Sequence, residues 1–287
     1  MTSQGKEIFS IFKKRDENAN KGDFGRALLI CGSYGMAGAA AIAAKAVIKS
    51  GIGICDIACE DRIYPIVSPQ VPEAVCTPIS KNFDENDKNV LKKSLKKADV
   101  VVIGCGMGNT DYTDKILRCV FEHCRVPLII DADALNVLSK DIDLLLSKKC
   151  EVIITPHPGE MSRLIGKTTA EINADRIKTA TAFSKKYGVV TLLKGKGTVI
   201  SDRFGEYVIN ESGSVSMATG GSGDMLCGII AAFLGEGFSC FDAARTGAYI
   251  HGLCGEVSAE KYSVRSTSAS TMLKILPEIY RQIEKGD

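Results

Sequence analysis

Short apolar runs alternate with longer amphipathic segments along most of this chain, and this alternation restricts the folds that it can adopt. Runs such as 27–31 and 100–103 have the length of buried strands, and segments such as 36–50 have the length of helices. Strands separated by helix-length segments favour a largely parallel sheet with helices on both faces. Because we find no linker, repeat or break in composition, we expect an α/β fold in a single domain over residues 1–287.

The expected elements follow from the same pattern. The strands are 27–31, 52–58, 100–103, 127–130, 152–154 and 189–194, followed by a hairpin of 198–201 and 206–209. The helices are 36–50, 84–97, 111–123, 169–187, 221–234, 241–261 and 273–284.

Composition limits the partners and the compartment. The formal net charge of +2 is too small to indicate a nucleic-acid or membrane partner. The 11 cysteines are scattered without a C-x-x-C pair, which is typical of buried thiols in a reducing cytoplasm. Residues 1–21 are polar and charged, unlike a signal peptide, and no uncharged apolar run reaches the roughly 18 residues of a membrane span. We therefore expect a cytoplasmic protein.

Polar and glycine residues recur directly after five of the expected strands. Any one glycine-rich turn is ordinary turn chemistry, but ligands of open parallel sheets bind at the carboxyl ends of the strands. Together, the five segments indicate one binding crevice. These segments are 32–35, 104–108, 131–133, 155–160 and 194–198.

The segment 217–224, with the sequence MATGGSGD, leads into an apolar helix and is the most specific motif. Glycines at a helix N-terminus let backbone N–H groups approach an anion, so this is a candidate phosphate cradle, although it lacks the Walker A pattern. Asp224 is either a first-turn helix acid or a general base that takes a proton from a substrate hydroxyl beside the phosphate. We favour the base. A Rossmann dehydrogenase is disfavoured, because the glycine spacing in 32–38 is wrong for one.

Two further strand ends carry candidate contact residues. In 194–198 (KGKGT), Lys194 is suited to reach a phosphate, although a hairpin turn with solvated lysines would look the same. In TPHPGE, His157 is held between two prolines, and Glu160 either caps the following helix or helps to hold a metal-bound phosphate. His123 and His251 lie in expected helices and are interpreted as structural, so we expect no zinc site.

Taken together, these motifs resemble the NAD(P)H-hydrate dehydratase family of the ribokinase-like superfamily. The resemblance runs from about Lys21 to Ile279. The matching motifs are 21–26 (KGDFGR), 32–33 (GS), 38–40 (GAA), 131–136 (DADALN), 155–160 (TPHPGE), 193–195 (LKG), 217–224 (MATGGSGD) and 249–252 (YIHG).

The resemblance implies a ribokinase-like fold and a repair reaction. The family dehydrates the S-epimer of hydrated NADH or NADPH by phosphorylating the ring hydroxyl and eliminating phosphate, with Mg²⁺ and ADP, less often ATP. By resemblance, Asp224 is the base that activates the hydroxyl. The residues implied to contact the hydrate are Ala40, Gly106, His157 and Asp224. Those implied to hold the adenine nucleotide are Lys194, Gly195, Lys196, Gly197, Thr198 and Gly223.

Some features depart from the family pattern. Members often read Gly-Pro-Gly where this chain has Cys105 between glycines, and Asn where it has Ser214. Many bacterial members are fused to an epimerase domain, for which this chain has no room. We therefore expect a separate epimerase as pathway partner, and homo-oligomers are common in the family. The alternatives are a small-molecule alcohol kinase of the same superfamily and a non-catalytic nucleotide-binding regulator.

Overall fold

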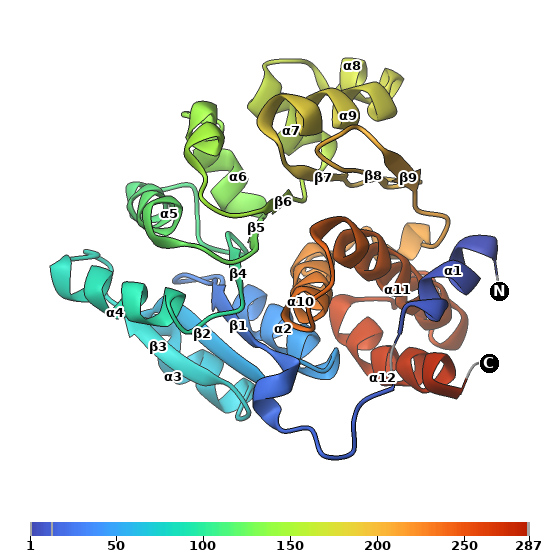
Figure 1. Cartoon of the computed structure of the whole chain (residues 1–287), viewed down its shortest axis with the longest axis horizontal. Helices are drawn as coiled ribbons and strands as arrows, with labels where there is room; N and C mark the ends of the chain where they lie inside the picture. The colour runs from blue at the N-terminus through green and yellow to red at the C-terminus, as the bar shows by residue number, and fades with distance from the viewer. Residues whose placement is uncertain (1, 13, 286–287) are drawn as a thin grey trace.

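The computed structural model describes residues 2–12 and 14–285, and these residues form one nine-stranded sheet (Figure 1). The strand order is β3-β2-β1-β4-β5-β6-β7-β8-β9. All neighbouring pairs from β3 to β7 are parallel, and β8 and β9 are added as antiparallel strands. The strands are β1 (Arg26–Ile30), β2 (Ile54–Glu60), β3 (Val75–Ile79), β4 (Val100–Ile103), β5 (Leu128–Ile130), β6 (Val152–Ile154), β7 (Val190–Leu193), β8 (Val199–Ser201) and β9 (Tyr207–Ile209).

Helices cover both faces of this sheet, as Figure 1 shows. The α-helices are α1 (Ser3–Ser10), α2 (Ala37–Lys49), α3 (Tyr64–Val67), α4 (Glu85–Leu95), α5 (Asp111–His123), α6 (Ala132–Leu138), α7 (Pro158–Ile165), α8 (Thr169–Ala174), α9 (Arg176–Tyr187), α10 (Ser222–Gly235), α11 (Cys240–Lys261) and α12 (Ala269–Lys285). Short 3-10 helices are η1 (Lys21–Phe24), η2 (Asp61–Ile63), η3 (Ser68–Gln70), η4 (Ile142–Ser147) and η5 (Val215–Met217).

The sheet separates two hydrophobic cores, because successive strand side chains point to opposite faces. Ala27 and Leu29 of β1 pack in the layer of α2, α10, α11 and α12. Leu28 and Ile30 pack in the layer of α4, α5, α6, α7 and α9. The expected α/β fold with helices on both faces of the sheet is confirmed. Because both faces are buried, the strands read as continuous apolar runs.

The strand register brings the predicted strand-end motifs to one edge. Ile30 pairs with Ile103, Ile103 with Ile130, and Ile130 with Ile154. The last residues of β1, β4, β5 and β6 therefore lie level. The strand order reverses at β1, which has β2 on one side and β4 on the other. A reversal of this kind leaves a crevice outside the carboxyl ends of the strands, where ligands bind.

Several elements differ from the predicted pattern, which also lacks the helices α1, α3 and α6. Residues 169–187, expected as one helix, form α8 and α9, because Asp175 leaves helical geometry (φ −149°, ψ 80°) and its side chain caps α9. The prediction lacks β3, which is an edge strand that contains Pro78, a residue that edge strands tolerate. Helix α12 begins at Ala269 rather than 273 and continues through Pro277.

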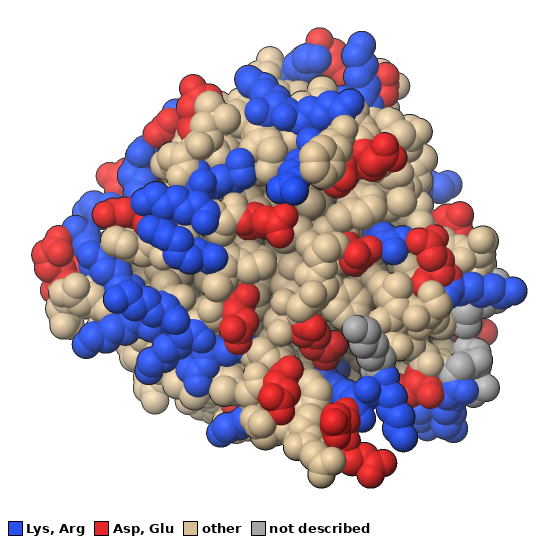
Figure 2. All heavy atoms as spheres, viewed as in Figure 1, with Lys and Arg blue, Asp and Glu red and all other residues tan. Residues whose placement is uncertain are grey.

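The expectations from composition can be compared with the described residues. None of their helices is long and apolar enough to cross a bilayer. All eleven cysteines are free thiols, nine of them buried, as predicted. Charges of both signs share the face in Figure 2, and Lys and Arg side chains gather along its left side, where α4 lies in Figure 1.

Candidate active site

A cavity of about 410 Å³ opens at the carboxyl edge of the sheet, at the point where the strand order reverses. Its walls come from the loops after β1 and β4, from the first turns of α2 and α6, and from the N-terminus of α10. Segments that are far apart in the sequence therefore share one site. The lining residues are Gly35, Met36, Gly38, Ala39, Ile42, Gly106, Asp133, Gly221 and Asp224.

Asp224 lies in the first turn of α10 and lines this cavity. Gly221 precedes the helix in left-handed geometry (φ 84°), which lets the chain turn sharply into α10. Burial and the nearby charge of Asp131 raise the pKa of Asp224 to about 6. A carboxylate with this pKa is mostly ionised at pH 7 yet more basic than an ordinary aspartate, which suits a general base.

Lys194, at the end of β7, is held by two buried carboxylates. Its Nζ lies 2.7 Å from Asp131 Oδ1 and 3.8 Å from Glu160 Oε2. The Thr155 hydroxyl also donates to Asp131 Oδ1, at 2.7 Å. Burial opposes the charge of Lys194, but the two carboxylates outweigh it and raise the pKa of Lys194. The ammonium group is therefore a fixed cation at the strand ends.

Gly223 joins this cation to the N-terminus of α10. A Cβ atom at Gly223 would lie 3.5 Å from Lys194 Nζ and 3.6 Å from Asp131 Oδ2. The 14-residue helix also directs the positive end of its dipole and its free N–H groups to this point. An exposed backbone, a helix N-terminus and a fixed ammonium group together form an anion site suited to phosphate.

The loop 194–198 connects β7 to β8 and is stabilised by Arg176 at the start of α9. The Arg176 guanidinium donates to the carbonyl oxygens of Leu193, Lys196 and Gly197 at 3.0, 2.6 and 2.9 Å. Gly195 and Gly197 have positive φ angles of 146° and 62°. Thr198 donates its hydroxyl to Gly195 O at 3.0 Å. The loop is therefore an ordered turn, in which only Lys194 joins the carboxylate network.

His157 is the N-cap of α7 and is half-exposed. Its Nδ1 accepts the N–H of Gly159 at 2.9 Å, which leaves Nε2 as the protonated ring nitrogen of the neutral imidazole. Burial and the positive charge of Lys194 lower the pKa of His157. The ring therefore offers a neutral N–H donor. Glu160 does cap the helix, because its Oε2 accepts the His157 N–H at 2.8 Å, and it also contacts Lys194.

The remaining predicted residues, Gly106 and Ala40, differ in placement. Gly106 lines the cavity with φ 62°, and a Cβ there would lie 2.6 Å from Ala39 Cβ. Ala40 is fully buried, with its side chain against Gly32, whose own Cβ would lie 2.9 Å from Ala40 Cβ. The neighbouring Gly38 and Ala39 line the cavity instead.

A family model described as NAD(P)H-hydrate dehydratase matches residues 27–278 of this chain. The chain belongs to the NAD(P)H-hydrate dehydratase family. It is 32% identical over 282 residues to the ADP-dependent (S)-NAD(P)H-hydrate dehydratase of Streptococcus pneumoniae, covering 96% of this chain and 94% of that protein. It is 35% identical over 280 residues to the bifunctional NAD(P)H-hydrate repair enzyme of Moorella thermoacetica, covering 96% of this chain and 53% of the relative. The chain thus spans about half the length of the bifunctional relatives.

Solved structures agree with this family. The ADP/ATP-dependent NAD(P)H-hydrate dehydratase of Bacillus subtilis, co-crystallised with ATP and Mg²⁺, superposes with a TM-score of 0.84 at 28% identity, covering 97% of this chain and 96% of that one. The ribokinase of Thermotoga maritima shares the fold alone, with a TM-score of 0.55 at 14% identity over 88% of this chain and 99% of that one. The predicted ribokinase-like fold is confirmed.

Several site residues of this NAD(P)H-hydrate dehydratase family member are absent from the candidates chosen by sequence. Asp133 lines the cavity and accepts the Gly108 N–H at 2.7 Å. Asp131 pairs with Lys194, and Thr155 donates its hydroxyl to Asp131. Their place directly after strands was the available signal. His251, interpreted as structural, is buried with Nε2 3.2 Å from the hydroxyl of Ser222, at the start of α10.

Proposed function

We propose that this chain converts the S-epimer of NAD(P)H hydrate to NAD(P)H, with ADP, or less favourably ATP, as phosphoryl donor. One observation carries the proposal: an Asp224 carboxylate with a raised pKa lies beside an anion site built from Lys194 and the N-terminus of α10. A base next to a phosphate site is what phosphorylation of a hydroxyl requires. The names of the family and of the relatives from S. pneumoniae and B. subtilis support the same substrate.

In this mechanism, Asp224 takes the proton of the ring hydroxyl while the hydroxyl oxygen attacks the terminal phosphorus of the nucleotide. The P–O bond to the leaving nucleotide breaks, so ADP becomes AMP. Lys194 and the N–H groups at Gly223 stabilise the charge on the phosphoryl oxygens. The ring C–O bond then breaks with loss of phosphate, and a proton leaves the neighbouring carbon to restore the double bond. Phosphorylation is needed because hydroxide is a poor leaving group.

The other predicted residues fit binding roles around this centre. Gly106 lets the hydrate approach the backbone, and His157 offers its Nε2–H as a hydrogen-bond donor. Lys196, Gly197 and Thr198 extend the nucleotide site from Lys194 along the ordered turn. Ala40 acts through the packing of α2 rather than by side-chain contact, because its methyl group is buried.

Magnesium fits the chemistry of the donors at this edge. Mg²⁺ prefers carboxylate and phosphate oxygens, and it usually binds through one or two carboxylates and the phosphates of the substrate. Glu160, with Asp131 beside it, supplies such oxygens next to the anion site. When bound, the ion would neutralise charge on the phosphates. We infer that Glu160 holds it directly, or through phosphate or water.

The wider setting is also a proposal. Since the Moorella and other relatives are named bifunctional repair enzymes, we propose that an epimerase supplies the S-epimer here. A net charge of +2 and mixed surface charge favour small-molecule partners over nucleic acid or membrane. We further propose a cytoplasmic homo-oligomer.

The test is recovery of NADH absorbance when the purified chain is incubated with hydrated NADH, Mg²⁺ and either ADP or ATP. We expect recovery that requires nucleotide, that is faster with ADP, and that is about 10²–10⁴-fold slower in Asp224→Asn. Nucleotide consumption without recovery of NADH would instead indicate the alternative, an alcohol kinase that releases a stable phosphate ester.

A further inference from the structure

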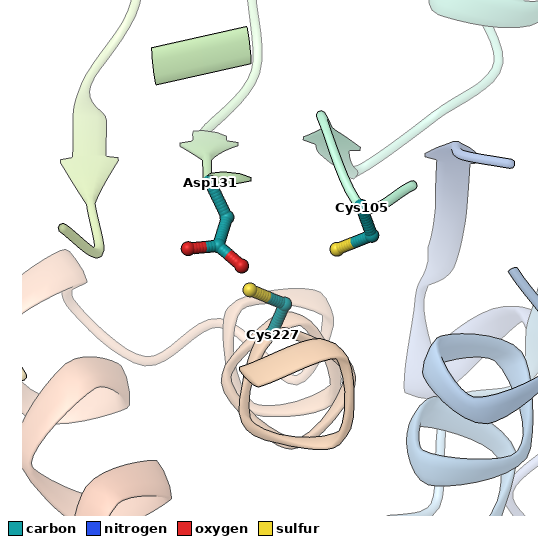
Figure 3. A group of neighbouring side chains, drawn as sticks. All are labelled: Cys105, Asp131 and Cys227. Atoms are coloured by element: carbon teal, nitrogen blue, oxygen red, sulfur yellow. The ribbon is translucent and has the colours of Figure 1, made fainter. Parts of the chain in front are cut away.

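Three side chains from separate elements converge on one point (Figure 3), and one of them, Asp131, also pairs with Lys194 of the anion site. Cys105 follows β4, Asp131 follows β5, and Cys227 lies one turn along α10 from Gly223. The two Sγ atoms and one carboxylate oxygen all lie within 4.8 Å of one another. All three residues are buried, with relative exposures of 0, 1 and 0%. Among the described residues, this is the group of three whose donor atoms could bind one metal ion.

The donor set and its spacing select a thiophilic ion rather than Mg²⁺. Zinc binds thiolate sulfur at about 2.3 Å and carboxylate oxygen at about 2.0–2.2 Å, so two thiolates on one tetrahedral zinc are about 3.8 Å apart. The observed upper bound of 4.8 Å therefore requires side-chain shifts of about 1 Å or less. Magnesium prefers oxygen donors and would not favour a site that is two-thirds sulfur.

We propose that Cys105, Cys227 and Asp131 form a binding site for a single Zn²⁺-like thiophilic ion, and that this ion competes with Lys194 for Asp131. Asp131 Oδ1 now lies 2.7 Å from Lys194 Nζ, so an ion on this carboxylate weakens that ion pair. Three protein ligands leave the fourth tetrahedral position for water or a phosphate oxygen.

The net charge of the buried group does not change when the ion binds. Before binding, two neutral thiols, the Asp131 carboxylate and the Lys194 ammonium sum to zero. After binding, two thiolates, the carboxylate, the ammonium and Zn²⁺ again sum to zero, and two protons have left. Contact with Cys105 and burial raise the pKa of Cys227 well above its usual value, so its proton is present at pH 7 and must be released. Cys31 and Asp224 face Cys105, and Lys194 faces Cys227, so these groups also set the affinity.

The consequence for activity rests on the proposed function. Loss of the Lys194–Asp131 pair disturbs the cation at the phosphate site, and the metal lies next to Asp224, which also neighbours Cys105. We therefore expect the thiophilic ion to inhibit the enzyme, whereas Mg²⁺ does not occupy this site. Binding is measured without nucleotide or hydrate, so it is independent of the proposed activity.

The test titrates the reduced full chain with Zn²⁺ against a chromophoric chelator, and with Cd²⁺ while recording the ultraviolet thiolate-to-metal charge-transfer band. We expect one tight ion per chain, two protons released, and a band of two-thiolate intensity. Cys105→Ala/Cys227→Ala should lower the affinity more than about 100-fold, since loss of outer-shell partners alone costs 10–100-fold.

A matched control removes two thiols elsewhere. Cys124 and Cys150 interact with each other and precede β5 and β6, so they lie at the amino ends of these strands, away from the site. Cys124→Ala/Cys150→Ala should therefore keep the tight ion and the full band. The proposal is overturned if this control loses the site, or if Cys105→Ala/Cys227→Ala retains it. If that double variant does not fold, each single variant should halve the Cd²⁺ band, and a full band in either would equally overturn the proposal.

Discussion

Gly223→Ala separates binding at the anion site from stability, because Gly223 lies in α10 without a positive φ angle. The added methyl group would lie 3.5 Å from Lys194 Nζ and 3.6 Å from Asp131 Oδ2, which are ordinary contact distances. Alanine in a helix is favoured over glycine by about 0.5–1 kcal/mol. We therefore expect the melting temperature to stay the same or to rise by about 1–3 °C.

Nucleotide binding should respond in the opposite direction. A phosphate oxygen that accepts from Lys194 Nζ and the backbone of α10 must occupy the volume that the methyl group takes. Loss of one charge-assisted hydrogen bond costs about 1.5–3 kcal/mol. At 1.4 kcal/mol per tenfold change, the Kd for ADP should rise roughly 10- to 100-fold.

Calorimetric titration with ADP and thermal unfolding would measure both effects. Gly38→Ala is the matched control, because Gly38 also lies in a helix, with no atom within 4 Å of an added Cβ, on the wall of the cavity formed by α2. It should stabilise the fold and leave ADP binding unchanged. Unchanged ADP affinity in Gly223→Ala would refute the phosphate site at the N-terminus of α10.

Four further outcomes follow from Asp224 and Lys194. Asp224→Asn should lower kcat by about 10²–10⁴ while calorimetry shows ADP still binding, and equal activity would remove Asp224 as the base. Because the pKa of Asp224 is about 6, kcat/KM should fall about tenfold per pH unit below pH 6, and a profile flat down to pH 5 would contradict that pKa. The same raised pKa makes the native state more stable below the ordinary aspartate pKa, and this stability is lost as pH rises through 6. Asp224→Asn should therefore unfold a few degrees higher than the parent at pH 7 but not at pH 4, as thermal melts at both pH values would show. Lys194→Met leaves the buried Asp131 carboxylate without its cation and should lower the free energy of unfolding by about 3–5 kcal/mol, as chemical denaturation would measure. A loss below about 1 kcal/mol would show that Lys194 is not the main partner of Asp131.

Much of the fold follows from local sequence, because buried parallel strands read as apolar runs and helices have a different period. The exceptions have local physical causes. Asp175 breaks a helix by capping the next one, which periodicity does not register. Strand β3 carries Pro78 and is poorly buried, so its sequence resembles a loop.

The site was partly predictable for a different reason. Glycine and polar residues directly after strands mark the binding edge, so Lys194 and His157 stand out locally. Asp224 stands out through the glycine-rich segment that leads into α10. Which groups pair cannot be read locally, since the Lys194–Asp131 ion pair joins residues 63 positions apart. Cys227 carries no local signal, because a thiol inside an apolar helix looks like an ordinary core residue, and only the packing of α10 against the sheet brings it to Cys105.

The central claim is that the ring hydroxyl leaves as phosphate derived from the nucleotide. The most direct measurement is the amount of AMP and inorganic phosphate formed per NADH regenerated from its hydrate, with ADP as donor. We expect one AMP and one phosphate for each NADH, and all three products forming about 10²–10⁴-fold more slowly in Asp224→Asn. Regeneration of NADH without AMP, or AMP formed together with a stable phosphorylated hydrate, would contradict the account.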